Sequence, residues 1–510
     1  MRLEPAFKCG LLSRTVRSFF LAAAIALTAE ASIVLAGLPP KWLFVPAAAG
    51  CFCLLLAAVG SLRKALMAFL IFSLSMDLGV SIGYSDRYVP LRTGIPIPMT
   101  SLLLLAIYGH HLCTSSWHRR SIRLFPQVTL PLALLVLWSG ISLAVADQVS
   151  GVLSHFPYAF EALCIFVYAV NFVRSDDDMQ FVIRCIAITV TVTGVLGILQ
   201  YVAPNANLQF RGARDLQFVQ EYYATTISRV SGFLDHPNSL AVFLSAWLPV
   251  LLVFGLGIDR LRFQLLCLLS FALGSVVLVL TYSRVGWVAF AFSLLLIVAF
   301  LVTRDFRERF RRMTLRLFAF LLTATVLTIP LIPNIVTRVS DDDSGSAYSR
   351  ITMAQSALKI IERNWATGVG LGNYENAIWA YDTSPPLLPN GIPYPVHNMY
   401  LYMAAELGLP ALILFLWITV SLFSAGVHVV RAANHTIALS ALGLSVGLAS
   451  MHLCGMVGVI TLGHVSFVPL MFVGGLLVSL RYRAKEPVDP FLREKDTTPT
   501  SVAAQLGRAS

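Results

Sequence analysis

Hydrophobic residues occur along the chain in runs of about twenty, separated by short clusters of charged residues, proline or glycine. A helix of that length crosses a hydrocarbon core of roughly 30 Å. The runs are continuous and do not alternate with polar residues, as the strands of a membrane barrel would. The pattern therefore predicts an all-α polytopic membrane protein with about 12–14 transmembrane helices. The expected spans lie near 18–38, 42–61, 65–84, 96–113, 127–146, 155–173, 180–203, 238–257, 261–282, 285–303, 314–333, 397–424, 436–457 and 462–480.

Two connections, 204–237 and 334–396, are much longer than the others. Long ordered connections in a compact protein are usually functional. Apolar residues recur at helical spacing from Ala347 to Asn364, and a glycine-rich turn follows at 368–373. We therefore predict a large periplasmic loop containing short helices. The expected division is N-terminal transmembrane helices 1–203, first periplasmic loop 204–237, central helices 238–333, large periplasmic loop 334–396, C-terminal helices 397–480, and a cytoplasmic, disordered tail 481–510.

Charge supports a membrane location and explains the basic balance. Charged residues are 12% of the chain and hydrophobic residues 57%, which excludes an ordinary water-soluble fold. The net charge of +11 arises mainly from Lys and Arg in connections expected to face the cytoplasm, so it indicates topology and not nucleic-acid binding. The apolar run Phe19–Leu38 exceeds a typical signal-peptide core, and we interpret it as a retained first helix.

Basic residues on the outer side are candidates for function, because topology does not explain them. Arg229 lies in the first long connection, Arg284 in the tight turn between two spans, and Arg350 in the second long connection. Guanidinium groups bind phosphate oxygens in a bidentate manner. The alternative for each is an interfacial arginine that snorkels or pairs with a carboxylate.

His397 begins the twelfth expected span, directly after a proline-rich segment. Its imidazole has an ordinary pKa of about 6.5, which suits a general base near neutrality. The alternative is a histidine that caps a helix at the interface. Glu406 lies nine residues further on and is expected to face away from His397, fixing the span through a helix-end or backbone group. No histidine spacing typical of a zinc site occurs, the eight cysteines offer no disulfide framework or thiolate site, and we predict no metal and no cofactor.

Four segments, taken in order, resemble the O-antigen ligase and polymerase superfamily of bacterial membrane glycosyltransferases. They are Arg229–Phe233 with His236–Ala241, Tyr282–Trp287, Ser349-Arg350 with Gly368–Tyr374, and His397-Asn398 with Glu406–Gly408. The resemblance covers roughly residues 225 to 420. It implies that Arg229 and Arg284 grip a diphosphate and that His397 is the catalytic base. Arg350, Asn238 and Asn398 are the residues expected to bind substrate.

By this resemblance, the chain is expected to transfer a glycan from a polyprenyl-diphosphate carrier to a saccharide or lipid-sugar acceptor, without metal, at the periplasmic face of the bacterial inner membrane. Direct displacement would invert the anomeric centre. The expected partners are the lipid-linked donor, the acceptor and membrane lipid, and polysaccharide export or chain-length proteins are compatible additional partners. The sequence leaves open whether the acceptor is a lipid A core sugar, a growing polysaccharide or a protein, with a slight preference for exopolysaccharide polymerisation.

The competing class is a lipid-linked saccharide flippase, which also has 12–14 spans in about the same length of chain. Flippases usually carry polar residues along a central cavity and have short loops. A scaffold or co-polymerase would leave His397 and Arg284 unexplained. Clustering of the polar residues at one face, with one long loop, favours the transferase.

Overall fold

The structure is a computed structural model of the whole chain. It describes residues 60–76, 79–82, 94–113, 122–203, 229–258, 260–303, 311–318, 346–382, 395–432, 434–458 and 466–485, together with positions 50, 56, 57, 385, 393 and 463. The expected span at 18–38 lies outside these residues, as do most of the expected spans at 42–61 and 314–333, most of the first long connection and most of the expected tail.

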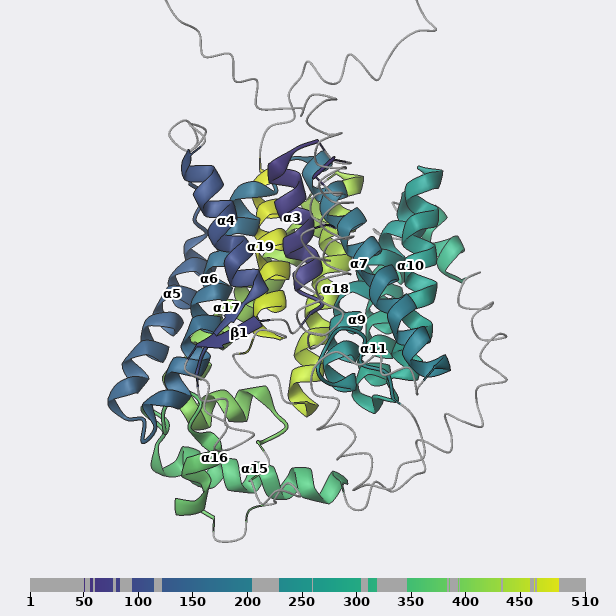
Figure 1. Ribbon diagram of the computed structural model, residues 1–510. Helices are drawn as coiled ribbons and strands as arrows, with labels where there is room; N and C mark the ends of the chain where they lie inside the picture. Colours follow the sequence, from purple (N-terminus) through teal and green to yellow (C-terminus); the bar gives the residue numbers. More distant parts are fainter. Residues whose placement is uncertain are drawn as a thin grey trace, which may run out of the picture.

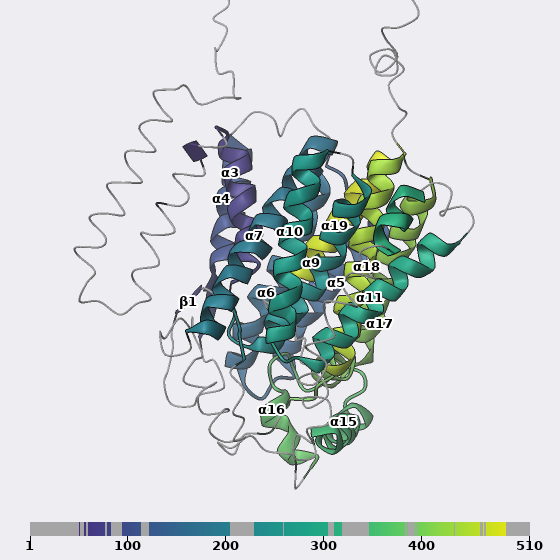
Figure 2. The same ribbon diagram turned by 90° about the vertical axis from the view of Figure 1, so that its right-hand side faces the viewer.

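A bundle of long helices forms the body of the molecule (Figures 1 and 2). Eight helices are long and apolar enough to cross a membrane among the described residues. The bundle comprises α5 (Pro126–Ile141), continued by a short 3-10 turn η2 (Ser142–Ala144), then α6 (Val149–Phe172), α7 (Asp176–Val202), α9 (Pro237–Gly257), α10 (Leu261–Leu280), α11 (Arg284–Val302), α17 (Met399–Ala432), α18 (His435–Val457) and α19 (Phe467–Arg483). This arrangement confirms the predicted all-α polytopic membrane fold.

The two kinds of helix surface show which elements are central. Helices α9 and α18 lie in the interior, where almost every side chain, including Trp247, is buried. By contrast, Leu137 on α5, Leu269 on α10 and Leu295 on α11 are each 60% or more exposed. Large apolar side chains on an outer surface are unstable in water but suit the hydrocarbon of a bilayer. The outer helices therefore present a lipid-facing surface.

The third expected span, 65–84, is wrong. The helix α3 (Leu62–Ser73) ends after 12 residues, and Gly79–Ile82 forms strand β1, which pairs antiparallel with β2 (Ile95–Pro98). In the partner strand β2, Pro96 and Pro98 disfavour a helix, and Gly79 of β1 permits close pairing, because a Cβ there would lie 2.9 Å from the Ile97 carbonyl oxygen. Helix α4 (Met99–Cys113) follows β2 and agrees with the fourth expected span.

A separate layer, which we call the loop layer, lies below one end of the bundle in Figure 1. We call that end of the bundle the loop end. It contains α15 (Ser346–Arg363), α16 (Tyr374–Ala377) and the 3-10 turn η5 (Ile378–Ala380). Met353, Ala357 and Ile360 of α15 pack on Tyr374 and Tyr402 in a small core of their own. These elements confirm short helices in the second long connection.

The glycine-rich turn joins this layer to α17. Backbone N–H groups of Val369 and Gly370 donate to the carbonyls of Ala405 and Glu406 at 3.0 and 2.9 Å. Gly368 has a φ of 69°, and a Cβ there would lie 2.2 Å from the Glu406 backbone. Only glycine fits this close approach, which explains why the turn contains glycine at this position.

The same contact breaks α17, so the expected continuous span at 397–424 is wrong. Gly408 has φ 76° and ψ 173°, which are not helical, and the N–H of Leu409 donates to the Trp365 carbonyl at 2.7 Å. Residues up to Leu407 therefore form a short helix of the loop layer, and the membrane-crossing part begins after Gly408. Glu406 lies in the short helix, where its carboxylate accepts the Tyr374 N–H at 3.4 Å.

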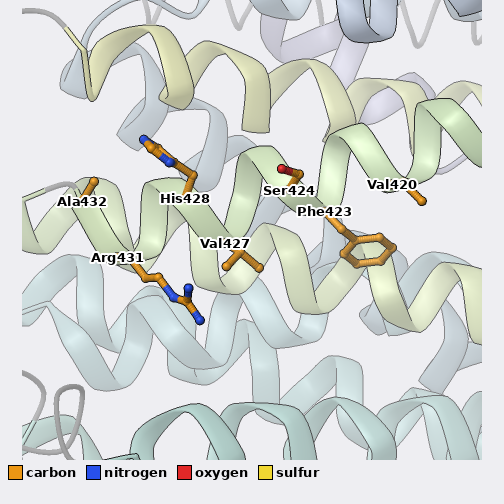
Figure 3. Close-up of a pocket in the computed structure, with 7 residues that line it drawn as sticks. All are labelled: Val420, Phe423, Ser424, Val427, His428, Arg431 and Ala432. Carbon is orange, nitrogen blue, oxygen red and sulfur yellow. The ribbon is translucent and has the colours of Figure 1, made fainter.

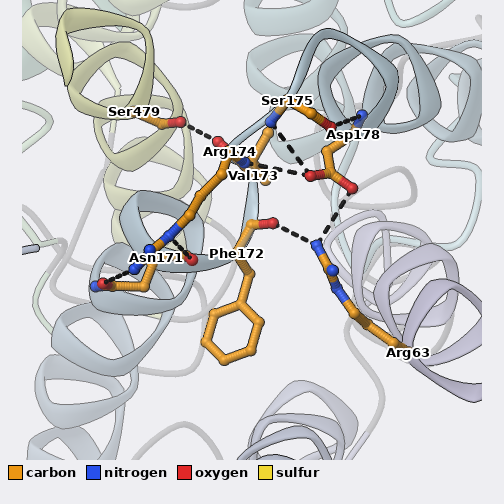
Figure 4. A network of polar contacts seen from close by, with 8 residues as sticks. All are labelled: Arg63, Asn171, Phe172, Val173, Arg174, Ser175, Asp178 and Ser479. Carbon is orange, nitrogen blue, oxygen red and sulfur yellow. Dashed lines mark hydrogen bonds and ion pairs between the residues drawn. The ribbon is translucent and has the colours of Figure 1, made fainter. Parts of the chain in front are cut away.

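A polar network ties helices together at the opposite end of the bundle, at the turn between α6 and α7 (Figure 4). Arg63 of α3 donates to the Phe172 carbonyl at 2.6 Å and pairs with Asp178 at 3.2 Å. Ser175 and Asp178 form a capping box at the start of α7. On the other side, Ser479 and Arg483 of α19 bind the Val173 carbonyl and the Asp176 carboxylate.

Candidate active site

Arg229 is held against the turn between α10 and α11. Its Nε donates to the Thr281 carbonyl at 2.8 Å, and one terminal nitrogen donates to the Asn238 side-chain oxygen at 3.0 Å. The following residues are fixed by Gln200 of α7, whose side-chain oxygen accepts from the N–H groups of Ser231 and Gly232 and whose amide donates to the Gly232 carbonyl. Arg229 is therefore positioned by backbone and amide groups.

Arg284 is the first residue of α11, directly after a strained turn. Tyr282 has a φ of 49°, the left-handed region that non-glycine residues seldom adopt. Ser283 then caps the helix by accepting the Gly286 N–H. Strain of this kind persists where the surrounding structure over-determines it, often at functional sites.

The amino-terminal ends of α9 and α11 lie against each other at the loop end. A Cβ on Gly286 would be 2.7 Å from the Ala241 Cβ, so no larger residue fits between the helices. Helix amino-termini carry partial positive charge and exposed N–H groups. With Arg229 and Arg284 beside them, the two ends form a site of positive potential that suits an anion.

His236 immediately precedes α9 and also belongs to this region. Its Nδ1 accepts the Asn238 N–H at 3.0 Å, so the ring caps the helix and the neutral tautomer carries its proton on Nε2. Burial, with the nearby charges of Arg229 and His397, lowers the pKa of His236 to about 3. The ring stays neutral and can donate.

His397 lies close to His236, between the loop layer and the bundle, and is partly buried. Its Nδ1 is 3.0 Å from the Pro395 carbonyl oxygen. Since a carbonyl can only accept, Nδ1 carries the proton and the lone pair of the neutral ring lies on Nε2. Burial lowers the pKa of His397, the Arg350 guanidinium lowers it further, and the bond to Pro395 opposes both.

Helix α15 brings Arg350 close to His397. The guanidinium is near enough for its charge to lower the pKa of the imidazole. The structure thus gathers four predicted residues, Arg229, Arg284, Arg350 and His397, at the loop end from four different parts of the chain. Asn238 joins them as the partner of Arg229. This set offers cations for an anionic group beside an imidazole with a basic nitrogen.

Asn398 has a different environment from the one expected. Its side-chain oxygen accepts the N–H groups of Tyr400 and Leu401, and its amide donates to the Met456 carbonyl at 3.2 Å. These bonds cap α17 and fasten it to the end of α18. Asn398 therefore holds His397 in place, and the structure shows no role for it beyond that.

A pocket of about 690 Å³ lies elsewhere, along the carboxyl-terminal half of α17 (Figure 3). Its lining is mainly apolar, and His428 and Arg431 point in different directions from the helix. The pocket lies along residues 420–432 of α17, whereas His397 directly precedes the start of that helix, so the two are at opposite ends of α17. The pocket is not part of the candidate site. The lining residues are Val420, Phe423, Ser424, Val427, His428, Arg431 and Ala432.

Comparison with known families agrees with the order of the motifs. Residues 269–416 match the family described as O-antigen ligase. The match includes Arg284, Arg350 and His397, and it confirms the predicted resemblance to the O-antigen ligase and polymerase superfamily. It supports a glycosyltransferase-like ligase or polymerase activity in a membrane, with a lipid-linked glycan donor and a saccharide acceptor. No curated protein matches the chain.

Proposed function

We propose that this protein transfers a glycan from a polyprenyl-diphosphate carrier to a hydroxyl of a saccharide or lipid-sugar acceptor, without a metal ion. The observation that carries the proposal is the meeting of Arg229 and Arg284, beside two helix amino-termini, with His397 at one end of the bundle. Arg229 and Arg284 suit the negative charge of a diphosphate. His397 supplies the base that an acceptor hydroxyl needs.

The chemistry follows from the two groups. The Nε2 atom of His397 takes the proton of the acceptor hydroxyl. The hydroxyl oxygen then forms a bond to the anomeric carbon of the glycan. The bond from that carbon to the diphosphate oxygen breaks, and the electron pair leaves with the carrier. The charge that grows on the leaving diphosphate is stabilised by Arg229, Arg284 and the positive ends of the α9 and α11 helix dipoles. Attack opposite to the leaving group inverts the anomeric centre.

Orientation is part of the proposal. Arginines lie at the helix ends of the bundle that are opposite to α15: Arg63 at the start of α3, Arg123 before α5, Arg260 before α10, Arg431 at the end of α17 and Arg483 at the end of α19. Because basic connections face the cytoplasm, the loop end faces the periplasm of the inner membrane. There it meets the diphosphate of a carrier anchored in the outer leaflet.

Topology is tested with single cysteines at Glu362 and Arg311 in a background stripped of native cysteine. A membrane-impermeant maleimide applied to intact spheroplasts should label position 362 and leave 311 unlabelled until the membrane is opened. Labelling of both from outside, or of 311 alone, contradicts the orientation.

Activity is tested with purified protein, a polyprenyl-diphosphate oligosaccharide, an acceptor glycan and a chelator, with product and released carrier both measured. The proposal expects equal amounts of both in the presence of chelator, and a product linkage of inverted configuration. Activity that requires a divalent cation would refute the metal-free mechanism. Movement of intact donor across the bilayer without cleavage would show a flippase instead.

A further inference from the structure

Helix α15 has an apolar face that the protein core does not cover. One face, with Met353, Ala357 and Ile360, is buried in the loop layer. On the adjacent face, Ile351 and Leu358 are 59% and 53% exposed. They are seven residues apart and so lie on one line along the helix. The apolar surface of α15 is therefore much wider than its packing in the loop layer requires.

Trp365 lies in the turn that follows α15, two residues after the helix ends at Arg363. Its side chain is 60% exposed. Tryptophan is enriched where the hydrocarbon of a membrane meets the headgroups, because its ring is apolar and its N–H is polar. We call Ile351, Leu358 and the following Trp365 the α15 stripe. It thus ends in the residue type typical of that boundary.

The α15 stripe is continuous with the membrane-facing surface of α17. The Trp365 carbonyl accepts the N–H of Leu409, the first residue of the membrane-crossing part of α17. Leu409, Ile413 and Val420 are 36%, 63% and 67% exposed and recur at helical spacing, as a lipid-facing row does. The Trp365 end of the stripe therefore meets the Leu409 end of this row.

The remaining face of α15 is polar. Lys359 and Arg363 are exposed there, and Lys359 pairs with Asp382 at 3.4 Å. The helix thus has three faces, one on protein, one apolar and uncovered, and one for water. Its axis lies across the bundle, not along it (Figure 1). These are the properties of a helix that lies in a membrane interface.

We propose that the α15 stripe docks on the lipid of the leaflet at the loop end of the bundle, with its apolar side chains below the headgroups and its polar face in water. The contact fixes α15 from two sides, lipid and loop layer. It thereby holds Arg350, near the start of the helix, at the depth of His397. The proposal uses only the membrane-spanning bundle and α15, so it stands or falls separately from the glycan-transfer proposal.

The test places a nitroxide label on single cysteines at Ile351 and Leu358, in cysteine-free protein reconstituted in vesicles of phosphatidylethanolamine and phosphatidylglycerol. Matched controls carry the label at Lys359 and Arg363, which are exposed and lie roughly 80° to 140° around the same helix from Ile351 and Leu358. Oxygen concentrates in lipid, and a water-soluble nickel chelate is excluded from it. The ratio of relaxation by oxygen to relaxation by nickel should be several times higher at 351 and 358 than at the two controls.

Each other result overturns the proposal. Equal ratios at all four positions would place the stripe in water. Protection of 351 and 358 from both relaxants would mean that protein covers them, and dilution of labelled into unlabelled protein would then show whether a second copy is responsible. Brominated lipid gives a second measurement that needs no cysteine. It should quench the fluorescence of the wild type more than that of Trp365→Phe, and equal quenching counts against the contact.

Discussion

The two halves of the candidate site are built in different ways. Arg229 and Arg284 belong to the bundle, where Gln200, Thr281 and the strained Tyr282 fix the backbone around them. His397 and Arg350 belong to the loop layer, which meets α17 through a glycine turn and lies partly outside the bundle. In the mechanism that we propose, the difference separates the residues that stabilise the leaving group from the residue that accepts a proton. The first must be rigid before substrate arrives, since preorganised charge needs no rearrangement during reaction.

The largest expected effect is the loss of the base. His397→Ala should lower the rate of transfer by roughly 10² to 10⁴ while donor binding, which belongs to the bundle half, is nearly unchanged. His428→Ala, an exposed histidine at the far end of α17, is the matched control and should be silent. Turnover and binding of a labelled donor are measured on the same preparations. If His397→Ala lost donor binding as well, the two halves would not be separate in function.

Next comes the shape of the cation in the bundle half. Arg284→Lys keeps the charge but cannot grip two phosphate oxygens at once. We expect it to cost about 3 kcal/mol in the transition state, roughly a hundredfold in rate, and nearly as much as Arg284→Ala. Arg311→Lys, exposed at the opposite end, controls for the substitution itself. Near-normal transfer by Arg284→Lys would reduce Arg284 to an interfacial anchor.

The close contact between the glycine turn and the backbone of α17 can be disrupted by adding one methyl group. In Gly368→Ala the new methyl would lie 2.2 Å from the Glu406 carbonyl carbon and oxygen, at a φ of 69°. Strain and overlap together should destabilise the fold by about 3 kcal/mol. Gly109→Ala, where a methyl meets nothing within 4 Å, should leave stability unchanged or slightly higher. Thermal unfolding followed by intrinsic fluorescence compares the two, and equal midpoints would disprove the close contact.

The smallest effect should be electrostatic. His397 acts as a base above its pKa, so activity is lost as the pH falls through that value, below the ordinary 6.5 because burial and Arg350 lower the pKa. Arg350→Gln removes a positive charge that disfavours imidazolium. The pKa of His397 should therefore rise, and the acid limb of the pH–rate profile should move to higher pH. Arg363→Gln, which removes a cation over Tyr381 on the same helix, should not move it.

Much of the fold followed from hydropathy, because bilayer thickness dictates the length of an apolar run. The hairpin of β1 and β2 and the break at Gly408 did not follow from hydropathy, since their signals are Pro96, Pro98 and Pro410 together with close backbone contacts, and none of these changes the length of an apolar run. At Gly408 an apolar stretch reads as one helix, and the approach of Ala366 makes it turn, with a Cβ there 2.6 Å from the Ala366 oxygen. Tertiary packing overrides local preference at such places.

The candidate site was partly predictable for a related reason. Arg229, Arg284, Arg350 and His397 are polar residues at positions that topology leaves unexplained, so they were visible in the sequence. His236 was not, because a histidine before a helix reads as a cap, and it is one. Its nearness to His397 arises from the packing of α9, α17 and α18, which hydropathy does not encode. The structure adds a helix-capping role for Asn398 at the start of α17, which its polarity alone did not indicate.

The network at the α6–α7 turn has a consequence for how the chain is made. Arg63 reaches this turn from a helix synthesised long before it, whereas Ser479 and Arg483 come from a helix synthesised about three hundred residues after it. During translation the Phe172 carbonyl and Asp178 are satisfied as soon as α7 enters the membrane. The Val173 carbonyl and Asp176 wait for α19. The contacts of the turn are thus completed last, and until α19 is made the half-exposed Asp176 carboxylate must be satisfied by water.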